Sequence, residues 1–501
     1  MQELREGVKK RDLTVLVVDE QLIKQPLKRG EVSMQIVQQI QEKFQRVAEL
    51  ILEMLVEGID FMRFQEEVQR EFNELGKEIL REALEAKDRD LREHREERPL
   101  WQVERINDTK EVLTVFGSVS YKRTYFRHKE TGEYAYLVDL LAGYGPHTRV
   151  DPLVKAEALE RACELSYRKS GEEAGRGNPE VVLSGEAVKR VIHSFTPEEL
   201  PEPPKEKRRV KVLYVQADED HVAGQEKKSH LVRLVYIHEG KVAVGKGRFK
   251  LKRPHYIGGI YHDIEELWLE VWSYIEEHYE VSCLERVYLC GDGDPWIRKG
   301  LEFLPQSAFV LDRFHLNEYL VAALGRGGDD WAAIWVALRE GDELKVWEIL
   351  KKASKAATSP GRKKAVCDCR RYIRKNWDGI MAYRRYPEAE LGVSAEAHVS
   401  HVLAARMSSR PMAWSAKGAD RMAQVRTMNA NGVCLKESYL AQFRRGLTRF
   451  TLPQKIIEEQ RQRLKQVVGE VFDNLPALRG PVTQLSRALK GLRDWNPLLG
   501  L

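Results

Sequence analysis

Between residues 210 and 315 the chain alternates short apolar segments with polar turns, and this alternation restricts its fold more than any other feature. Segments 210–217, 230–238 and 241–249 are rich in valine and are bounded by glycine, aspartate and other charged residues, a pattern typical of β-strands. Their close spacing predicts three strands of an antiparallel meander, with the second turn at residues 239–240.

The same region continues with an amphipathic helix over 263–279, a strand over 286–290, a helix from Pro295 and a strand over 308–311. The predicted order of elements is therefore βββαβαβα. This order, with an acid after the first strand and another after the fourth, is the outline of a ribonuclease H-like α/β domain with a mixed sheet. For the whole chain it predicts a multidomain α+β protein.

The rest of the chain divides by composition and periodicity. Residues 31–95 repeat apolar side chains at three- and four-residue intervals, which predicts a helical arm that either packs as a hairpin or contacts DNA. Helices expected between residues 151 and 195 suit a helix-turn-helix, and a helical connector is the alternative. The predicted domains are the helical arm 1–100, a β-hairpin region 101–150, the helical region 151–200, a Pro-rich linker 201–209, the ribonuclease H-like domain 210–328 and 388–450 with an all-α insertion 329–387, and a C-terminal helical tail 451–501.

The composition excludes several classes of protein. With 43% hydrophobic and 32% charged residues the chain is globular, and its formal net charge of +5 means that a nucleic-acid partner must be argued from clusters of charge. Six cysteines without paired CxxC motifs exclude a disulfide framework and favour a cytoplasmic location. The apolar run near the N-terminus is far shorter than a membrane span of about 20 residues, so no membrane role is expected.

Two of the predicted strands are each followed in the sequence by an aspartate. Asp218 directly follows the first strand, and Asp292 follows the fourth after one glycine. These strands are neighbours in a ribonuclease H-like sheet, so the two carboxylates are expected to converge at its edge, where Mg²⁺ or Mn²⁺ relieves their repulsion. A two-metal site needs a third acid, and the order of elements in ribonuclease H-like proteins would place it on a later helix. Glu396 is the candidate, because Ser394 can cap a helix that has the glutamate in its first turn.

Four sequence strings carry a family resemblance: VQADEDHV, LCGDGDPWI, FVLDRFHLNEYL and GVSAEAHVSHVLAARMSSRPMAWS. Together with TVFGSVSYKRTYF and YLVDLLAGYG nearer the N-terminus, they resemble the ISLre family of bacterial insertion-sequence transposases, which is similar in layout to the Mutator-like DDE transposases. The resemblance covers nearly the whole chain. It implies a DDE site at Asp218, Asp292 and Glu396 that holds two Mg²⁺ or Mn²⁺ ions. Asp294 departs from the small residue expected at its position, which leaves open whether Asp292 or Asp294 binds metal.

Further side chains are expected beside these acids: Asp220, Asp294, Asp312 and His315. His315 is expected to orient a carboxylate or DNA, and a solvated position is the alternative for Asp220. The spacing of Asp312 and His315 corresponds to the (C/D)xxH element of Mutator-like enzymes, and a structural Asp–His pair is the alternative. Acids at strand ends are also common as helix caps or solvated turn residues, so each acid taken alone has a structural explanation.

Basic clusters beside aromatic residues in the second half of the chain predict a DNA-binding surface. Its expected members are Arg370, Arg371, Arg374, Lys375, Arg406, Arg410, Trp414, Lys417 and Arg421. The alternative for any single cluster is a solvated helix face beside core tryptophans. The function expected is metal-dependent DNA strand cleavage and strand transfer at the ends of an insertion sequence, by a homodimer or higher oligomer on DNA. The alternatives are a domesticated DNA-binding protein that does not cleave, and a structure-selective nuclease on the same fold.

Overall fold

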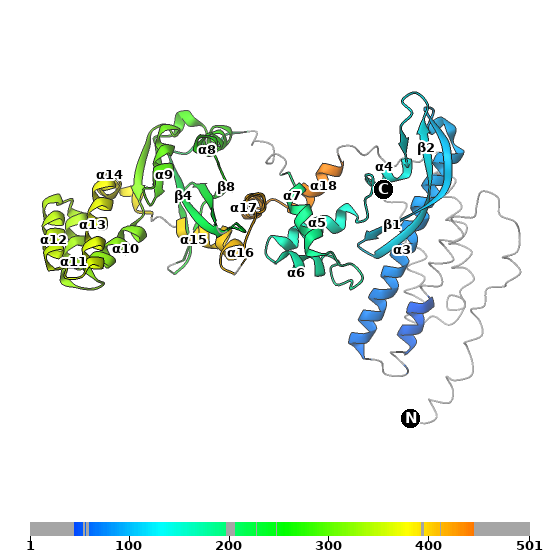
Figure 1. Ribbon diagram of the computed structural model, residues 1–501, viewed down its shortest axis with the longest axis horizontal. Helices are drawn as coiled ribbons and strands as arrows, with labels where there is room; N and C mark the ends of the chain where they lie inside the picture. The colour runs from blue at the N-terminus through cyan, green and yellow to red at the C-terminus, as the bar shows by residue number, and fades with distance from the viewer. Residues whose placement is uncertain are drawn as a thin grey trace, which may run out of the picture. The chain divides into compact units, whose positions relative to one another are not determined.

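The computed structural model describes residues 45–53, 56, 60–196, 206–226, 228–246, 248–391, 395–410 and 412–444 (Figure 1). The fold is mixed α+β, and the chain divides into two compact units, one of residues 1–149 and 446–501 and the other of residues 150–445. Residues 1–44 of the predicted arm, residues 201–205 of the predicted linker and the predicted tail 451–501 lie outside the described residues. Among the helices that are described, none is long and apolar enough to cross a lipid bilayer.

The first unit combines one long helix with an antiparallel hairpin. In chain order it contains α3 (Phe61–Glu93), the 3-10 helix η2 (Arg95–Glu97), β1 (Trp101–Thr114), β2 (Gly117–His128), β3 (Tyr134–Ala135) and α4 (Leu137–Leu141). Asp60 caps α3 by accepting a hydrogen bond from the backbone N–H of Met62. The helix packs on β2, where Val119 and Tyr121 alternate with exposed residues and are buried.

A buried ion pair ties α4 to this hairpin. Asp139 on α4 accepts hydrogen bonds from Lys110 Nζ of β1 at 2.9 Å and from the hydroxyl of Tyr121 of β2 at 2.5 Å, and it also pairs with Arg123. Lys110 is 7% exposed and Asp139 is 5% exposed. Burial, and then the hydrogen bond to Asp139, raise the pKa of Tyr121, so this hydroxyl keeps the proton that it donates. The short helix is therefore held to both strands by charge as well as by apolar contact.

The second unit joins three helices to a sheet. Its elements up to the last strand are α5 (Pro152–Ala162), α6 (Tyr167–Glu172), α7 (Gly185–Ser194), β4 (Val212–Ala223), β5 (Ser229–His238), β6 (Lys241–Gly245), β7 (Arg248–Leu251), β8 (His255–Gly259), α8 (Ile264–His278), η3 (Val281–Cys283), β9 (Arg286–Gly291), α9 (Pro295–Lys299), η4 (Gly300–Glu302) and β10 (Ser307–Leu311). Ser184 caps α7, since its hydroxyl accepts a hydrogen bond from the N–H of Ala187.

The remaining elements of this unit are helical. They are α10 (Arg313–Leu324), α11 (Asp329–Glu340), α12 (Glu343–Ala356), α13 (Pro360–Lys375), α14 (Trp377–Arg385), the 3-10 helix η5 (Pro387–Leu391), α15 (Ala395–Val399), the π-helical turn η6 (Ser400–Ala404), α16 (Ala405–Met407), α17 (Ala416–Ala430) and α18 (Leu435–Arg444). Residues 329–387 thus contain α11 to α14 and the start of η5, and no strand occurs among them.

The five-stranded sheet has the order β10-β9-β4-β5-β8. β9 is parallel to β4 and β10 is parallel to β9, whereas β5 is antiparallel to both of its neighbours, β4 and β8. One strand therefore runs against the other four. α17 packs on the edge strand β8, and α14 packs on the opposite edge strand, β10.

The third strand of the sheet is not the predicted segment 241–249. That prediction was wrong, because this segment contributes to a separate two-stranded hairpin of β6 and β7, and β8 occupies the place in the sheet. Residues 242–245 of β6 are exposed, whereas all five residues of β8 are buried. The strand residues Gly258 and Gly259 make this possible, since a Cβ there would lie 3.1 Å from the Thr427 side chain or 2.9 Å from that of Asp420, both on α17.

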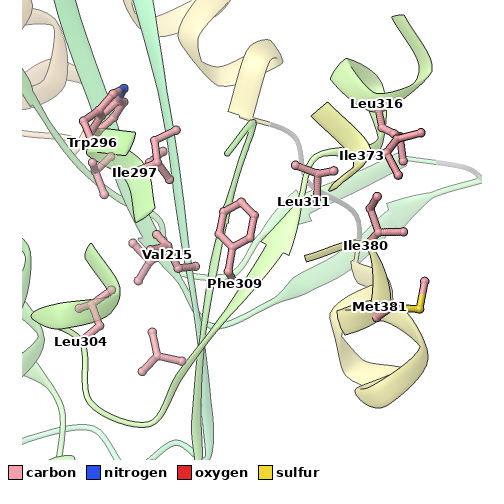
Figure 2. Close-up of a cluster of buried hydrophobic side chains, with 14 of the residues drawn as sticks. Val215, Trp296, Ile297, Leu304, Phe309, Leu311, Leu316, Ile373, Ile380 and Met381 are labelled. Carbon is pink, nitrogen blue, oxygen red and sulfur yellow. The ribbon is translucent and has the colours of Figure 1, made fainter. Parts of the chain in front are cut away.

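The main core lies between one face of the sheet and α8, and it continues into the insertion. Leu213, Val215 and Ala217 alternate along β4 and belong to the same buried cluster as Trp268 of α8. Helices of the insertion extend this cluster, and Figure 2 shows Ile373, Ile380 and Met381 of the insertion together with Val215, Phe309 and Leu311 of the sheet.

Helix α14 crosses β10 at close range because Gly379 has no side chain. A Cβ at this position would lie 2.6 Å from the ring of Phe309 and 3.0 Å from the backbone nitrogen of Leu311. One turn later, the hydroxyl of Tyr383 donates a hydrogen bond to the carbonyl of Leu311 at 2.9 Å. The insertion is therefore in direct contact with the edge strand of the sheet.

Candidate metal centre at the strand ends

Three aspartates form one row across three adjacent parallel strands. The register pairs Gln216 of β4 with Cys290 of β9, and Cys290 with Val310 of β10. The acid row consists of the residues two positions further along each chain: Asp218, Asp292 and Asp312. Because side chains alternate with a period of two residues, all three project from the face that also carries Gln216. The row therefore brings together Asp218 and Asp292, which are 74 positions apart in the sequence.

Burial and mutual repulsion set the charge of this row. Burial is the largest cause that raises the pKa of Asp218 to about 7, and the carboxylates of Asp292 and Asp312 add to it. Burial also raises the pKa of Asp292 and that of Asp312. The charge of His315 lowers the pKa of all three carboxyls, so His315 lies near each of them. Within the described residues, no Lys or Arg forms an ion pair with any member of the row.

Local hydrogen bonds hold each acid in place. Asp218 accepts from the N–H of Glu219 at 2.8 Å, and Asp292 accepts from the N–H of Asp294 at 2.9 Å. Asp312 caps α10, since its Oδ1 accepts from the N–H of Phe314 at 2.8 Å, and this helix has His315 in its first turn. Each aspartate thus uses one oxygen to fix its own position on the backbone.

The helix of Glu396 lies against β4. Residues 395–399 form α15, which contacts β4, whereas Ser394 and the side chain of Glu396 lie outside the described residues. His398 is two residues after Glu396. Its Nδ1 forms a hydrogen bond with the hydroxyl of Tyr256 at 2.9 Å, and its ring centre lies 4.5 Å from that of Tyr236. Tyr236 pairs with Gln216, so α15 is held on the face of the sheet that bears the acid row.

The two aspartates of the GDGD turn have different neighbours. The charge of Asp292 raises the pKa of Asp218. Glu219 is the next residue of β4, and its pKa is raised first by burial and then by the charge of Asp294. Asp294 occupies the N-cap position of α9, but its side chain makes no capping hydrogen bond. Asp220 is on the same face as Asp218, and its Oδ2 is buried without a hydrogen-bond partner.

The donor atoms of the acid row suit a hard divalent cation. They are carboxylate oxygens, which are the ligands that Mg²⁺ and Mn²⁺ prefer. Asp312 is buried and Asp218 and Asp292 are half-buried. All three have raised pKa values, an arrangement in which a cation offsets repulsion. Among the described side chains, no group of three or more His, Cys, Asp and Glu residues is arranged to hold a metal ion, and the side chain of Glu396 is not among them.

The basic residues predicted on α13 are accessible. Arg371, Arg374 and Lys375 are exposed and Arg370 is half-buried. Lys375 lies close enough to Asp292 to lower the pKa of that carboxyl, against the stronger effect of burial. The exposed face of α13 therefore leads to the acid row.

Arg406 and Trp414 are interior residues and not surface contacts. Arg406 is 5% exposed and Trp414 is 6% exposed. The Nε of Arg406 donates to the carbonyl of Ala162 at the end of α5 at 3.0 Å, and its guanidinium lies 5.0 Å from the ring centre of Trp414. Arg426, which the sequence interpretation did not single out as a structural residue, is also buried and donates to the carbonyl of Cys163 at 3.1 Å. Arg406 and Arg426 together form the arginine clamp, and neither is exposed enough to bind a phosphate.

Of the other predicted basic residues, Lys417 and Arg421 lie near His193 of α7. Arg410 and Lys417 are exposed, and Arg421 is half-buried and donates to Gln424 at 2.7 Å. Burial, and then the nearby charges of α7 and α17, lower the pKa of His193. α17 packs on β8, and α13 packs on α14, which packs on β10, so α13 and α17 lie at opposite edges of the sheet (Figure 1).

Fold and site together define an α+β protein with a row of carboxyls of raised pKa at the ends of parallel strands. The chain belongs to an uncharacterised protein family, UPF0236, whose model matches residues 54–442. A UPF0236 protein of Caldanaerobacter subterraneus subsp. tengcongensis is 37% identical over 443 residues, which are 88% of this chain and 93% of the relative. A second one from the same organism is 36% identical over 451 residues, which are 90% of this chain and 96% of the relative.

A more distant relative is the UPF0236 protein in the vanSb 3′ region of Streptococcus gallolyticus. It is 25% identical over 349 residues, which are 66% of this chain and 75% of the relative. The names of the Caldanaerobacter proteins add one observation. The name of the first relative joins eleven locus designations, and that of another joins four.

Proposed function

We propose that this protein is a DDE-type transposase of a bacterial insertion sequence, related to the ISLre family, that cleaves DNA at the ends of its element and transfers the strands to target DNA. The observation that carries the proposal is the acid row, with Asp218 and Asp292 at the ends of neighbouring parallel strands and the helix of Glu396 against β4. The strand order, in which only β5 is antiparallel within the sheet, supports a ribonuclease H-like catalytic domain.

The names of the relatives support a mobile element. A gene that occupies many loci of one genome is expected of an insertion sequence, because each transposition by copying leaves another copy. The relative whose name joins eleven locus designations is 37% identical to this chain. This similarity and the acid row together support the activity proposed for this chain.

Asp218, Asp292 and Glu396 are proposed to hold two Mg²⁺ or Mn²⁺ ions. When bound, such ions supply Lewis-acid stabilisation of both the attacking and the leaving oxygen of an in-line displacement at a phosphodiester. Asp218 must lose its proton to act as a ligand, and its raised pKa means that metal and protons compete for it near neutral pH. His315 favours the ionised form of each carboxyl, and Asp312 fixes the helix from which His315 reaches them.

DNA is proposed to approach along α13. This helix has 16 residues and is therefore about 24 Å long. At a rise of about 3.4 Å per nucleotide, its exposed face spans about seven phosphates of one strand. Arg374 and Lys375 lie at the end of the helix that is next to Asp292. The basic residues of α17 would hold DNA at the opposite edge of the sheet. Assembly as a homodimer or higher oligomer on DNA, in the cytoplasm and on the nucleoid, is part of the proposal.

The experiment that tests the proposal is cleavage of DNA that carries the element's own ends, with Mg²⁺ or Mn²⁺. Asp292→Asn keeps the shape of the side chain but removes a metal-binding charge, so cleavage is expected to disappear while affinity for the ends stays the same or rises. Asp294→Asn is the matched control. It is expected to leave substantial cleavage, because Asp294 holds Asp292 through its backbone N–H, which the substitution keeps.

Other outcomes would replace the proposal. If the wild type binds the ends and cuts them with neither metal, the protein is a DNA-binding protein that does not cleave. If it cuts branched DNA regardless of the end sequence, it is a structure-selective nuclease. Loss of cleavage in Asp294→Asn alone would show that the wrong aspartate of the turn had been chosen.

A further inference from the structure

The turn that carries Asp292 is held by a helix of the insertion. The hydroxyl of Tyr372 on α13 donates a hydrogen bond to the backbone carbonyl of Asp292 at 2.7 Å. The ring of Tyr372 stacks on that of Tyr319 of α10, with the ring centres 4.1 Å apart. Two helices therefore aim this hydroxyl at the turn. The residues on both sides of Asp292 are Gly291 and Gly293, which restrain the backbone less than any other residue.

Asn376 fills the space beside the same turn. Gly293 has φ +91°, and a Cβ at this position would overlap the side chain of Asn376, which is fully buried. The Oδ1 of Asn376 accepts a hydrogen bond from Nη2 of Arg298 at 3.0 Å, and Arg298 in turn pairs with Asp378 at 2.8 Å. The amide is therefore held in position against the glycine by an arginine of α9 and cannot withdraw without breaking this contact.

The opposite side of the same helical turn faces solvent. Arg371, Arg374 and Lys375 are exposed, whereas Tyr372 and Asn376 point to the turn of Asp292. One turn of α13 thus carries cations that can grip a phosphate and the side chains that locate an acid of the metal centre. A displacement of about 1 Å between a phosphate and a metal-bound group is enough to slow catalysis about 100-fold.

On the basis of the proposed function, we propose that Tyr372 is a positioning residue for Asp292: it fixes the turn of this acid to α13, the helix whose exposed cations are proposed to bind DNA. Tyr372 acts through the backbone of Asp292 and touches neither DNA nor metal. Without its hydroxyl, the turn keeps the hydrogen bond from Asp294 N–H to Asp292 but loses its link to the helix that holds DNA.

The test compares Tyr372→Phe with wild type in three measurements: Mn²⁺ binding by electron paramagnetic resonance, affinity for end DNA, and the rate of cleavage as a function of Mn²⁺. Partners that orient a metal ligand typically contribute 10- to 100-fold to metal affinity or activity. We expect Mn²⁺ affinity and cleavage to fall by about this factor, cleavage to recover partly at high Mn²⁺, and DNA affinity to stay unchanged. A merely structural role would not separate the metal requirement from DNA affinity.

Two control variants make the comparison sharp. Tyr214→Phe removes the same kind of bond, from a tyrosine hydroxyl to the carbonyl of Glu388 at 2.9 Å, away from the turn of Asp292, and should leave the metal requirement unchanged. Arg374→Ala removes an exposed cation of α13 and should show the reverse pattern, with weaker DNA binding at an unchanged metal requirement. If Tyr372→Phe matches wild type in Mn²⁺ affinity and cleavage, the positioning role is refuted.

Hydrogen exchange keeps this inference separate from the proposed function. If the wild type neither binds Mn²⁺ nor cuts DNA, the proposed function fails, and the link from α13 to the turn is then judged by exchange of the amides of residues 290–294, 296 and 297. Faster exchange in Tyr372→Phe than in wild type and Tyr214→Phe would support the link. Equal exchange in all three proteins would overturn it.

Discussion

Asp139→Ala is expected to destabilise the hairpin unit far more than an ordinary substitution at a short helix. The change leaves the ammonium of Lys110, 7% exposed, without its 2.9 Å partner, and it removes the acceptor of the Tyr121 hydroxyl. Breaking a buried ion pair by removing one partner costs about 3–5 kcal/mol, and an orphaned buried hydroxyl adds about 1 kcal/mol. Arg123 also loses this partner but keeps its stacking on the Tyr136 ring, so we take the lower end of the summed range, about 4 kcal/mol.

Hydrogen exchange followed by mass spectrometry measures this effect in the hairpin without contributions from the other unit. A loss of about 4 kcal/mol in the free energy of opening corresponds to about a 1000-fold faster exchange of the β1 and β2 amides, at 1.36 kcal/mol per factor of ten. Amides of β4 and β9 are expected to exchange as in wild type, because they belong to the other compact unit.

Two further variants check the physical reason for this loss. Glu130→Ala removes an exposed acid just after β2 and should change stability by less than about 0.5 kcal/mol. Replacing both partners, as Lys110→Met with Asp139→Leu, should recover much of the loss, because an apolar pair of similar volume often replaces a buried ion pair without cost. A loss below about 1 kcal/mol for Asp139→Ala, or no recovery in the double variant, would refute the argument from burial.

Three other predictions follow from the second unit. Mn²⁺ binding should weaken about tenfold for each pH unit below about 7 and level off above it, because the raised pKa of Asp218 makes protons compete with metal; a titration at pH 6, 7 and 8 checks this. Gly379→Ala should lower the free energy of unfolding by about 1–3 kcal/mol, since the new Cβ would lie 2.6 Å from the Phe309 ring; denaturant unfolding measures it. DNA affinity should fall with salt at a log–log slope of about −0.9 per phosphate contacted on duplex DNA, and Arg374→Ala should reduce the slope by about 1.

The strand ends were predictable from the sequence because each acid follows an apolar run directly. Asp218 and Asp292 stand where a buried strand meets a polar turn, and this is visible without a structure. The register was not predictable. That Asp312 lies in the same row depends on the pairing of β10 with β9, which no local pattern encodes. Whether the side chain of Glu396 completes the site stays a prediction.

The sequence predictions failed where a residue's type does not match the environment that it has in the structure. Segment 241–249 has the β-branched residues of a buried strand, yet it also has two lysines and one arginine and lies exposed outside the sheet. The glycines of β8 give α17 room to pack. Arg406 belongs to a basic cluster beside aromatic residues, which is typical of a DNA-binding surface, but its partner is a carbonyl of α5 far away in the sequence. A helix end that needs donors can thus bury an arginine, and only the tertiary structure shows which arginine it is.

The arginine clamp also determines when the chain can finish folding. The carbonyls of Ala162 and Cys163 receive hydrogen bonds from side chains 244 and 263 residues later. At a synthesis rate of about 5–20 residues per second, about 13 to 50 s pass between the appearance of these carbonyls and that of Arg426. Helices α5 to α7 are made before the sheet but must wait for α17 to be completed. A nascent or truncated chain that stops before Arg426 therefore exposes the end of α5, and its unpaired carbonyls and apolar side chains make it a substrate for chaperones and proteases.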